Sequence, residues 1–328
     1  MTKIRVVVTG YTGFVGKVLV QRLQASGFEV IGIGRSQKSD GLETYQTNYN
    51  DLNFIDEIPK FSYFIHLASS LRYFGDQTEL NEANAILAER LYRKVDGKCD
   101  KFIHVSSIEA ASGYLFSSDT TFGRFERKLY VPKPRSRYGK SKLLAERMIA
   151  KSVGDTSIVS LRLGNVYSLQ HPSFLSDVIK STYQKSETSF SVNALLTRTL
   201  LPVSNDFVAE AILTEMQCTN EKYKRNVKYV VGTEVSVGNL QYLVKQNSSN
   251  LFTKIRKISL VVILLRLLQC KLKKNYGTFP TYLISSGVLR KYRSIPSGYE
   301  VYEENTEHQN DQIKKVIKSV VFQDKLNA

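Results

Sequence analysis

Cysteine and histidine are scarce in this 328-residue sequence, and their scarcity argues against several classes of protein. The three cysteines, Cys99, Cys218 and Cys270, are odd in number and far apart, so they form neither a disulfide framework nor a zinc-ligand pattern. The four histidines are isolated from one another, so we expect no metal site and no metal catalysis. Scattered reduced thiols, and an N-terminus that does not resemble a signal peptide, predict a cytoplasmic protein.

Long hydrophobic runs are also missing. The most apolar segment, residues 258–268, is far shorter than the roughly 20 residues that cross a bilayer, and lysines flank it within residues 254–274. A buried helix of a C-terminal domain is the favoured interpretation. A basic amphipathic helix in peripheral contact with a membrane surface is the alternative.

Acidic residues are fewer than basic ones, 30 against 46, so the formal net charge is +16. The lysines are spread along the chain and make no basic block with interleaved aromatic residues, which argues against a nucleic-acid partner. A solvated basic surface explains this charge, and an anionic small-molecule substrate is compatible with it.

The sequence does contain a glycine-rich turn between a strand and a helix. Residues 6–9 form a short β-branched run that predicts a buried parallel strand, and the apolar spacing that follows predicts a helix ending at Gly27. A second strand is expected at residues 28–33. Units of this kind bind dinucleotides, with the pyrophosphate against the helix N-terminus. The loop residues expected to bind the cofactor are Gly10, Tyr11, Thr12, Gly13, Phe14, Val15 and Gly16.

Two later apolar segments, residues 63–69 and 102–107, predict further buried strands that end in small or hydroxyl residues. Ligands of open α/β sheets bind at the carboxyl edge of the strands. We therefore expect Leu67 and Ala68 to line the cofactor and Ser107 to lie at the same edge.

Tyr138 and Lys142 are the clearest candidates for catalysis. They are four residues apart and so share one face of a predicted helix. A free tyrosine titrates at about pH 10, which is too high for efficient acid–base work at neutrality, and a neighbouring ammonium group lowers that pKa.

The glycine spacing Gly-x-x-Gly-x-x-Gly after Val-Thr, with a later Tyr-x-x-x-Lys and an upstream serine, resembles the extended short-chain dehydrogenase/reductase family. The resemblance implies an α/β fold with a Rossmann-type doubly wound parallel sheet and a smaller C-terminal substrate-binding domain. It implies that Ser107 hydrogen-bonds the reacting carbonyl and that Tyr138 is the general acid or base, while Lys142 also reaches the nicotinamide ribose. Asn84, on a helix expected over residues 82–95, resembles the family's supporting asparagine near the cofactor.

Arg35 and Asp51 bear on the choice of cofactor. Arg35 follows the second predicted strand, where a cation accommodates a 2′-phosphate and a carboxylate would favour NAD. NADP(H) is therefore favoured, with NAD(H) as the alternative. Asp51 and Leu52 resemble the family's acidic and hydrophobic pair beside the adenine.

Asn165 and Arg198 are the candidate substrate contacts. Asn165 lies in a segment that resembles the one whose asparagine reaches the diphosphate of a nucleotide sugar, and Arg198 resembles a phosphate contact of the same enzymes. Dehydratases of the family carry an aspartate where this chain has Ile108, so dehydration is disfavoured.

The resemblance leaves several activities open. The favoured one is reduction of a nucleotide-diphosphate 4-keto-6-deoxy sugar by NAD(P)H, in cell-surface polysaccharide synthesis. A nucleotide-sugar 4-epimerase with tightly held NAD uses the same residues, as does a reductase of steroid-like or flavonoid-like ketones. A non-catalytic NADP-sensing protein is a further alternative, which the presence of both Tyr138 and Lys142 disfavours.

The expected domain organisation follows from where the motifs lie. Residues 1–168, with a contribution from about 195–232, are expected to form the NAD(P)-binding domain. Residues 169–328 are expected to form mainly the substrate-binding domain. The resemblance also implies a homodimer.

Overall fold

A computed structural model of the chain describes residues 4–35, 42–72, 75–111, 134, 136–152, 154–173, 175–176, 179, 199–218, 225–236 and 299–326. One eight-stranded sheet dominates this part of the chain, with the order β12-β10-β6-β5-β4-β1-β2-β3 and parallel pairing throughout. Its strands are β1 (Arg5–Thr9), β2 (Glu29–Gly34), β3 (Glu43–Gln46), β4 (Tyr63–His66), β5 (Lys101–Ser107), β6 (Ser157–Leu163), β10 (Arg225–Val231) and β12 (Glu300–Glu303). The predicted doubly wound parallel sheet is confirmed.

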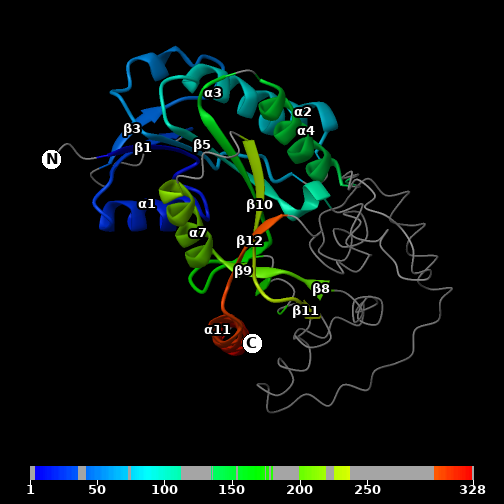
Figure 1. Cartoon of the computed structure of the whole chain (residues 1–328). Coiled ribbons are helices and arrows are strands. Elements are labelled where there is room, and N and C mark those ends of the chain that lie inside the picture. The colour runs from blue at the N-terminus through cyan, green and yellow to red at the C-terminus, as the bar shows by residue number, and fades with distance from the viewer. Residues whose placement is uncertain are drawn as a thin grey trace.

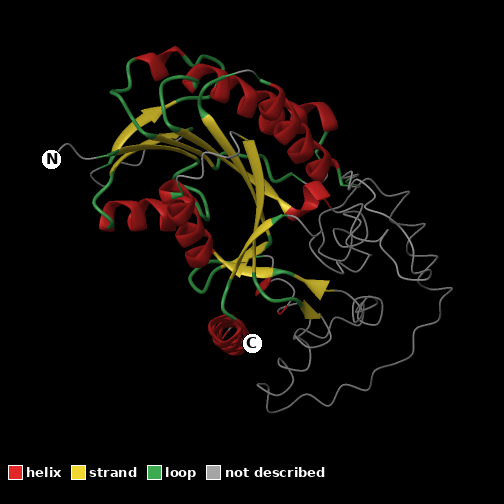
Figure 2. Ribbon diagram, in the orientation of Figure 1, coloured by secondary structure: helices red, strands yellow, loops and turns green. Residues whose placement is uncertain are grey.

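Helices cover both faces of this sheet (Figures 1 and 2). Helices α1 (Gly16–Ala25) and α7 (Asn205–Gln217) lie on one face, and α2 (Gln77–Asn81), α3 (Leu87–Val95) and α4 (Arg137–Lys151) lie on the other. Successive side chains of a strand point to opposite faces. Val6 and Val8 of β1 therefore pack into the core under α1 and α7, while Val7 packs into the core under α3 and α4. Burial on both faces explains why the strand is a continuous apolar run.

The helix expected over residues 82–95 is interrupted in the structure. Residues Glu82–Ile86 form a π-helical turn between α2 and α3, and Asn84 lies in its middle. Such turns widen a helix locally and are frequent at functional sites.

The last described segment returns to the main sheet. Strand β12 pairs in parallel with β10, and α11 (Thr306–Leu326) follows it. In α11 the fully buried Gln309 donates from Nε2 to the backbone oxygens of Pro202 and Thr233, at 3.1 Å each. This part of residues 169–328 thus extends the main sheet, and the assignment of the rest to a substrate-binding domain stays a prediction.

Two small strand pairs lie beside the main sheet. Strand β7 (Asn165–Tyr167) pairs in parallel with β9 (Pro202–Ser204), and β8 (Thr199–Leu200) pairs antiparallel with β11 (Val235–Ser236). Ser204 caps α7 by accepting the Phe207 N–H at 3.1 Å and donates its own proton to Glu304 Oε1 at 2.5 Å. This contact joins the C-terminal segment to the start of α7.

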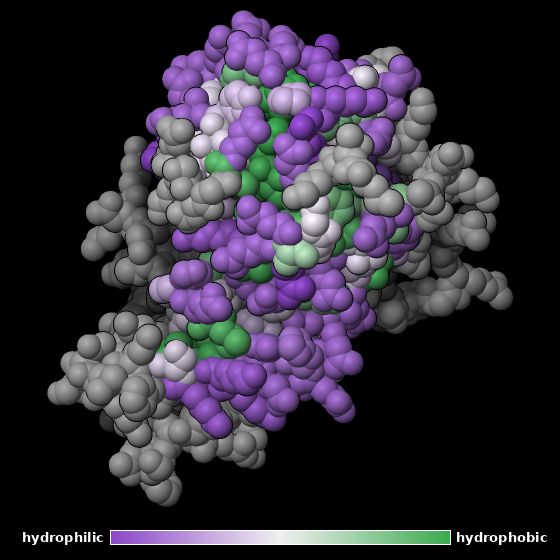
Figure 3. Space-filling model, turned by 90° about the vertical axis from the view of Figure 1, so that its left-hand side faces the viewer, coloured by the Kyte–Doolittle hydropathy of each residue, from purple (hydrophilic) through white to green (hydrophobic). Residues whose placement is uncertain are grey.

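Hydrophilic side chains cover most of the described surface on the face shown in Figure 3, and apolar side chains emerge between them in narrower areas. Among the described residues, none of the helices is long and apolar enough to span a membrane. Residues 254–274, for which we considered a membrane contact, lie outside the described residues.

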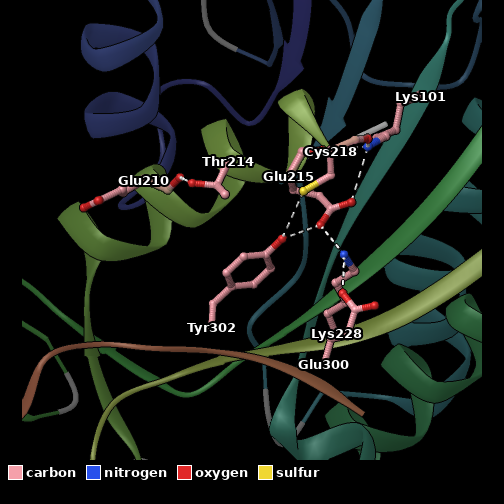
Figure 4. A network of polar contacts seen from close by, with 8 residues as sticks. All are labelled: Lys101, Glu210, Thr214, Glu215, Cys218, Lys228, Glu300 and Tyr302. Atoms are coloured by element: carbon pink, nitrogen blue, oxygen red, sulfur yellow. Dashed lines mark hydrogen bonds and ion pairs between the residues drawn. The ribbon is translucent and has the colours of Figure 1, made fainter. Parts of the chain in front are cut away.

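A buried network of charges ties α7 to the sheet (Figure 4). Glu215 of α7 accepts from Lys228 of β10 at 2.8 Å and from Lys101 of β5 at 3.3 Å. Lys228 also pairs with Glu300 of β12 at 2.6 Å, and Tyr302 donates to Glu215 Oε2 at 2.7 Å. Because Glu215 and Lys228 are each only 3% exposed, neither charge can be hydrated if its partners are lost.

We expect Glu215→Gln to lower the free energy of unfolding by about 3 kcal/mol, because it leaves the buried Lys228 ammonium with Glu300 as its remaining anionic partner. The midpoint of urea denaturation measures this change. The matched control is Glu210→Gln on the same helix, which is exposed and should change stability by less than about 0.5 kcal/mol. Equal midpoints for the two variants would contradict the prediction.

Candidate active site

Strands β1 and β4 are neighbours in the sheet, and the chain leaves them in opposite directions. After β1 it builds β2 and β3 on one side, and after β4 it builds β5 and β6 on the other. Such a switch point leaves a crevice at the carboxyl ends of the two strands, where open α/β sheets bind ligands. The glycine loop and the segment after β4 both leave the sheet at this point.

Gly10 ends β1 and allows its loop to approach the end of β4 closely. Its φ is +71°, and a Cβ at this position would lie 2.8 Å from the backbone nitrogen of Ala68. A residue with a side chain would be strained in this conformation and would push the two segments apart. The Gly10 N–H donates to the carbonyl oxygen of Ile33 in β2 at 3.0 Å, which ties the turn to the other neighbouring strand.

Gly16 begins α1 and packs directly on the loop before it. A Cβ on Gly16 would collide with the carbonyl oxygens of Gly10 and Tyr11. The exposed Gly13 donates its N–H to Gly10 O at 2.9 Å, which closes the turn. The first turn of α1 carries a partial positive charge, and its Lys17 N–H donates to Gly13 O at 3.1 Å. The residues predicted for the cofactor loop therefore fit a pyrophosphate.

Thr9 links the ends of β1 and β4. Its hydroxyl oxygen lies 2.8 Å from His66 Nδ1 and accepts the Ala68 N–H at 3.3 Å. The Leu67 N–H donates to Thr9 O at 3.2 Å. Leu67 and Ala68, which we expected to line the cofactor, are thereby held next to the glycine loop.

Arg35 is exposed directly after β2, at the carboxyl edge of the sheet. Its positive charge acts on Tyr49, whose hydroxyl donates to Ile33 O at 3.2 Å. Burial nevertheless raises the pKa of Tyr49 to about 12, so this hydroxyl stays protonated at neutral pH. The location of Arg35 suits a contact with a 2′-phosphate.

Asp51 and Leu52 precede a 3₁₀ turn at Asn53–Asp56. Asp51 Oδ1 accepts the Asn53 N–H at 2.9 Å, and Leu52 is buried in the core. Asp51 is exposed, and its contact with adenine stays a prediction.

Tyr138 lies in the first turn of α4 and is buried. Its side chain is in hydrogen-bond contact with Ser69, which follows β4, and with Ser107, which ends β5. Burial is the main cause that raises the pKa of Tyr138 above its ordinary value. The contacts with Ser69 and Ser107 oppose this rise, and the carboxylate of Glu109 adds to it. The structure thus brings Tyr138 and Ser107 together as their motifs suggested.

The start of α4 is held against the turn that follows β5. Ser136 caps the helix by accepting the Gly139 N–H at 2.9 Å, and it donates its proton to Glu109 Oε2 at 2.9 Å. A Cβ on Gly139 would collide with the carbonyl oxygen of Glu109. Glycine at this position therefore lets the first turn of α4 touch the backbone after Ser107 and places Tyr138 beside it.

Lys142 lies one turn after Tyr138 and is 3% exposed. Its ammonium donates to Val105 O of β5 at 3.0 Å and lies 5.9 Å from the centre of the Tyr138 ring. Burial lowers the pKa of Lys142 to about 8, and the Glu146 carboxylate opposes that change. Lys142 is therefore mostly cationic at neutral pH, so it can stabilise a phenolate at Tyr138.

Asn84 makes four hydrogen bonds to the protein. Its Oδ1 accepts from Ser69 Oγ at 3.0 Å and from Ser70 N–H at 2.7 Å. Its Nδ2 donates to Ser70 O and to Ser141 Oγ, at 3.0 Å each. Asn84 therefore joins the segment after β4 to α4, and its predicted contact with the cofactor stays a prediction.

Glu146 and Arg162 form a buried ion pair beneath the site. The guanidinium binds both carboxylate oxygens, at 2.9 and 2.7 Å, and donates to the Tyr229 hydroxyl at 2.8 Å. Ser106, next to Ser107 in β5, donates to Glu146 Oε1 at 2.5 Å. The pair thereby fixes α4 relative to β5 and β6.

Sequence reasoning did not assign Ser69 or Glu146 to the site. Ser69 ends the same apolar segment as Leu67 and Ala68, so its position at the carboxyl edge was a usable signal. Glu146 lies four residues after Lys142 and so on the same helix face, which was the corresponding signal for its role.

The structure describes one of the two residues predicted to contact the substrate. Asn165 begins β7, and its Oδ1 accepts the Leu201 N–H at 3.1 Å, which leaves its Nδ2 and the second lone pair of Oδ1 for a substrate. Arg198 lies outside the described residues. Both contacts stay predictions.

Comparisons with known proteins agree with this geometry. Residues 6–223 match the model of the NAD dependent epimerase/dehydratase family. The dTDP-6-deoxy-L-talose 4-dehydrogenase (NAD(P)(+)) of Kitasatospora kifunensis is 27% identical over 179 residues, covering 51% of this chain and 54% of that protein. The dTDP-4-dehydro-6-deoxyglucose reductase of Escherichia coli is 27% identical over 186 residues, covering 49% and 55%. The matches thus span about half the length of these curated relatives.

A solved structure extends the likeness over nearly the whole chain. The UDP-glucose 4-epimerase of Thermotoga maritima, solved with UDP-glucose, superimposes with a TM-score of 0.62 at 17% identity, covering 99% of this chain and 100% of that one. At this identity the likeness shows a shared fold.

We expect Gly16→Ala to weaken binding of NADPH at least tenfold, because the added methyl group collides with the carbonyl oxygens that close the loop. Titration of NADPH fluorescence measures the dissociation constant. The matched control is Gly97→Ala after α3, where a Cβ meets nothing within 4 Å and the positive φ affects stability only. Similar NADPH affinities in the two variants would show that the loop is not the cofactor site.

Proposed function

Because this chain belongs to the NAD dependent epimerase/dehydratase family, we propose that it is an NADPH-dependent reductase of nucleotide-diphosphate 4-keto-6-deoxy sugars. The observation that carries the proposal is the buried Tyr138 hydroxyl in contact with Ser107, with the Lys142 ammonium beside its ring. This group lies at the carboxyl edge of the sheet that also carries the glycine loop.

The arrangement suits reduction of a carbonyl group. NADPH held at the glycine loop would supply the hydride that reduces the ketone carbon. Ser107 donates a hydrogen bond to the ketone oxygen, and Tyr138 gives that oxygen its proton, so the ketone becomes a secondary alcohol. The Lys142 cation stabilises the resulting phenolate until solvent returns a proton to it.

Two relatives support a 4-keto sugar as the substrate class. The names of the Kitasatospora and Escherichia proteins both describe oxidation or reduction at position 4 of a dTDP-linked deoxy sugar. Ile108 stands where dehydratases of the family carry an aspartate, so this chain lacks one of the two acids that water loss requires there. A 4-epimerase with tightly held NAD is the second candidate. That activity needs the same residues, and this chain shares the fold of the Thermotoga enzyme.

The finer features of the proposal rest on the sequence. NADPH is preferred over NADH because Arg35, and no carboxylate, follows β2. The pathway is cell-surface polysaccharide synthesis, the location is the cytoplasm, and the assembly is a homodimer, each by resemblance to the family.

We expect the purified chain to consume NADPH in the presence of a dTDP-linked 4-keto-6-deoxy sugar, measured as loss of near-ultraviolet absorbance. Tyr138→Phe should lower kcat by about 10²- to 10⁴-fold, because the proton donor is removed. The matched control is Tyr63→Phe, at the amino end of β4, which should keep full activity. Interconversion of intact nucleotide sugars without net NADPH consumption would favour the epimerase, and inactivity in both assays would contradict the proposal.

Arg35→Ala tests the cofactor preference. We expect KM for NADPH to rise about tenfold, since one charge-assisted contact with the 2′-phosphate is lost, while KM for NADH stays the same. Parallel assays with the two cofactors measure both constants. A similar rise in KM for NADH would show that Arg35 does not contact the 2′-phosphate.

A further inference from the structure

Tyr49, which follows β3 at the carboxyl edge of the main sheet, has a backbone conformation that is rare for a residue with a side chain. Its φ is +67°, and among the residues that the structure describes it is the one residue other than glycine with a positive φ. A tyrosine in the left-handed region costs free energy and persists only where the surrounding structure holds it there. Strained residues of this kind are found at ligand-binding segments.

The side chain of Tyr49 joins its segment to the glycine loop. The hydroxyl donates to the carbonyl oxygen of Ile33 in β2 at 3.2 Å, and the N–H of Gly10 donates to the same oxygen at 3.0 Å. A carbonyl oxygen has no proton to give, so the direction of both hydrogen bonds is fixed. Because burial raises the pKa of Tyr49 to about 12, this hydroxyl keeps its proton at neutral pH. Tyr49 and the first glycine of the loop thus meet at one atom of β2.

Two more residues of the same segment bind the carbonyl groups that follow Ile33. The Thr47 N–H donates to Gly34 O at 2.9 Å, and Gln46 Nε2 donates to Arg35 O at 3.1 Å. Three successive carbonyl groups at the end of β2 are therefore held by the chain after β3. This segment sets the path of the backbone at Arg35, the residue that we propose contacts the 2′-phosphate.

Arg90 of α3 binds this segment from the helix. Its Nη1 donates to Tyr49 O at 3.3 Å, and its Nη2 donates to Asn50 O at 2.8 Å. The planar fork of a guanidinium can hold two neighbouring acceptors at once, whereas an ammonium is a single point of charge. The Tyr49 N–H donates to Thr47 Oγ1 at 2.9 Å. Both backbone polar groups of Tyr49 and its hydroxyl are thus engaged, which explains how the strained conformation persists.

The segment leads directly into the residue predicted to contact adenine. Asp51 lies between Asn50, whose carbonyl oxygen Arg90 binds, and Leu52, which is buried in the core. The backbone of Asp51 is therefore held on both sides, although the residue is exposed.

We infer that Arg90 is a positioning residue for the adenosine half of the cofactor, because it stabilises the left-handed Tyr49 and so holds residues 46–52 in the form that binds adenosine. Arg90 is exposed and lies outside every motif of the sequence. When only a fraction of the molecules has the binding-competent form, the apparent affinity falls by that fraction. Loss of the Arg90 contacts should therefore weaken cofactor binding and leave the reacting groups in place.

The inference deepens the proposed function and rests on it for the identity of the ligand, a nicotinamide cofactor. It does not depend on which sugar is reduced. It also holds for NADPH and for NADH, since both carry the adenosine.

The test measures binding of ADP-ribose to the full chain by isothermal titration calorimetry. This probe carries the adenosine and the pyrophosphate of either cofactor and lacks the nicotinamide. We expect Arg90→Met, which keeps an apolar side chain of similar reach, to raise the dissociation constant about tenfold, because two hydrogen bonds from a charged donor are lost. An unchanged dissociation constant would overturn the inference.

Two variants on the same helix sharpen the result. Arg93→Met is the matched control, since Arg93 is exposed and pairs with Glu89 of α3 instead of the segment after β3. It should leave ADP-ribose binding unchanged, and a rise equal to that in Arg90→Met would contradict the inference. Arg90→Lys keeps the charge without the fork and should give an intermediate dissociation constant.

A further pair of variants removes a contact on the other side of the segment. Tyr49→Phe keeps the ring and loses the hydroxyl that binds Ile33 O, so it should weaken ADP-ribose binding about threefold. Its control is Tyr45→Phe, which loses a hydroxyl that donates to the exposed Glu43. Equal affinities in these two variants would count against the role of the segment.

Steady-state kinetics separate this role from the proposed substrate. In Arg90→Met the KM for NADPH should rise about tenfold while kcat changes less than about twofold, and a fall in kcat with KM unchanged would contradict the inference. Weaker ADP-ribose binding in a chain that reduces no nucleotide sugar would support the role of Arg90 and reject the substrate. Active reduction with unchanged ADP-ribose binding would do the reverse.

Discussion

The contact between the first turn of α4 and the backbone after β5 is the constraint on which the site depends. Gly139 makes this contact possible, because any side chain would collide with the Glu109 carbonyl oxygen. Ser136 and Glu109 then hold the helix start by a hydrogen bond of 2.9 Å. The distance between the helix and the strand decides whether Tyr138 reaches Ser107.

Buried charges hold the helices on both faces of the sheet. Glu146 with Arg162 fixes α4 on one face, and Glu215 with Lys228 fixes α7 on the other. Buried pairs of this kind add little stability relative to apolar residues of similar size, but losing one partner is costly. We interpret these ion pairs as contacts that set the position of the helices. Helix α4 carries the predicted catalytic pair, and α7 packs beside α1, which follows the glycine loop.

Much of the fold could be predicted because its signals are local. The β-branched run at residues 6–9, the glycines of the following turn and the Tyr138–Lys142 spacing each lie within one strand, loop or helix, and the structure has them as expected. Asn84 was recognised as a residue of interest, but not the π-helical turn that carries it or its four bonds to the protein. This turn lies against α4 and the chain after β4, and the sequence pattern of residues 82–95 does not predict it.

The sequence by itself determined the α/β fold with a parallel sheet, and it predicted the glycine loop and the Tyr138–Lys142 pair, because periodicity and glycine placement act over a few residues. Only the tertiary structure decided what Asn84 binds. Its neighbours in sequence predict no more than a position on a helix. Its amide is oriented by Ser70, which lies 14 residues away along the chain, and by Ser141, which lies 57 residues away. The direction of a hydrogen bond depends on every other partner of its donor and acceptor, and those partners meet only after the chain has folded.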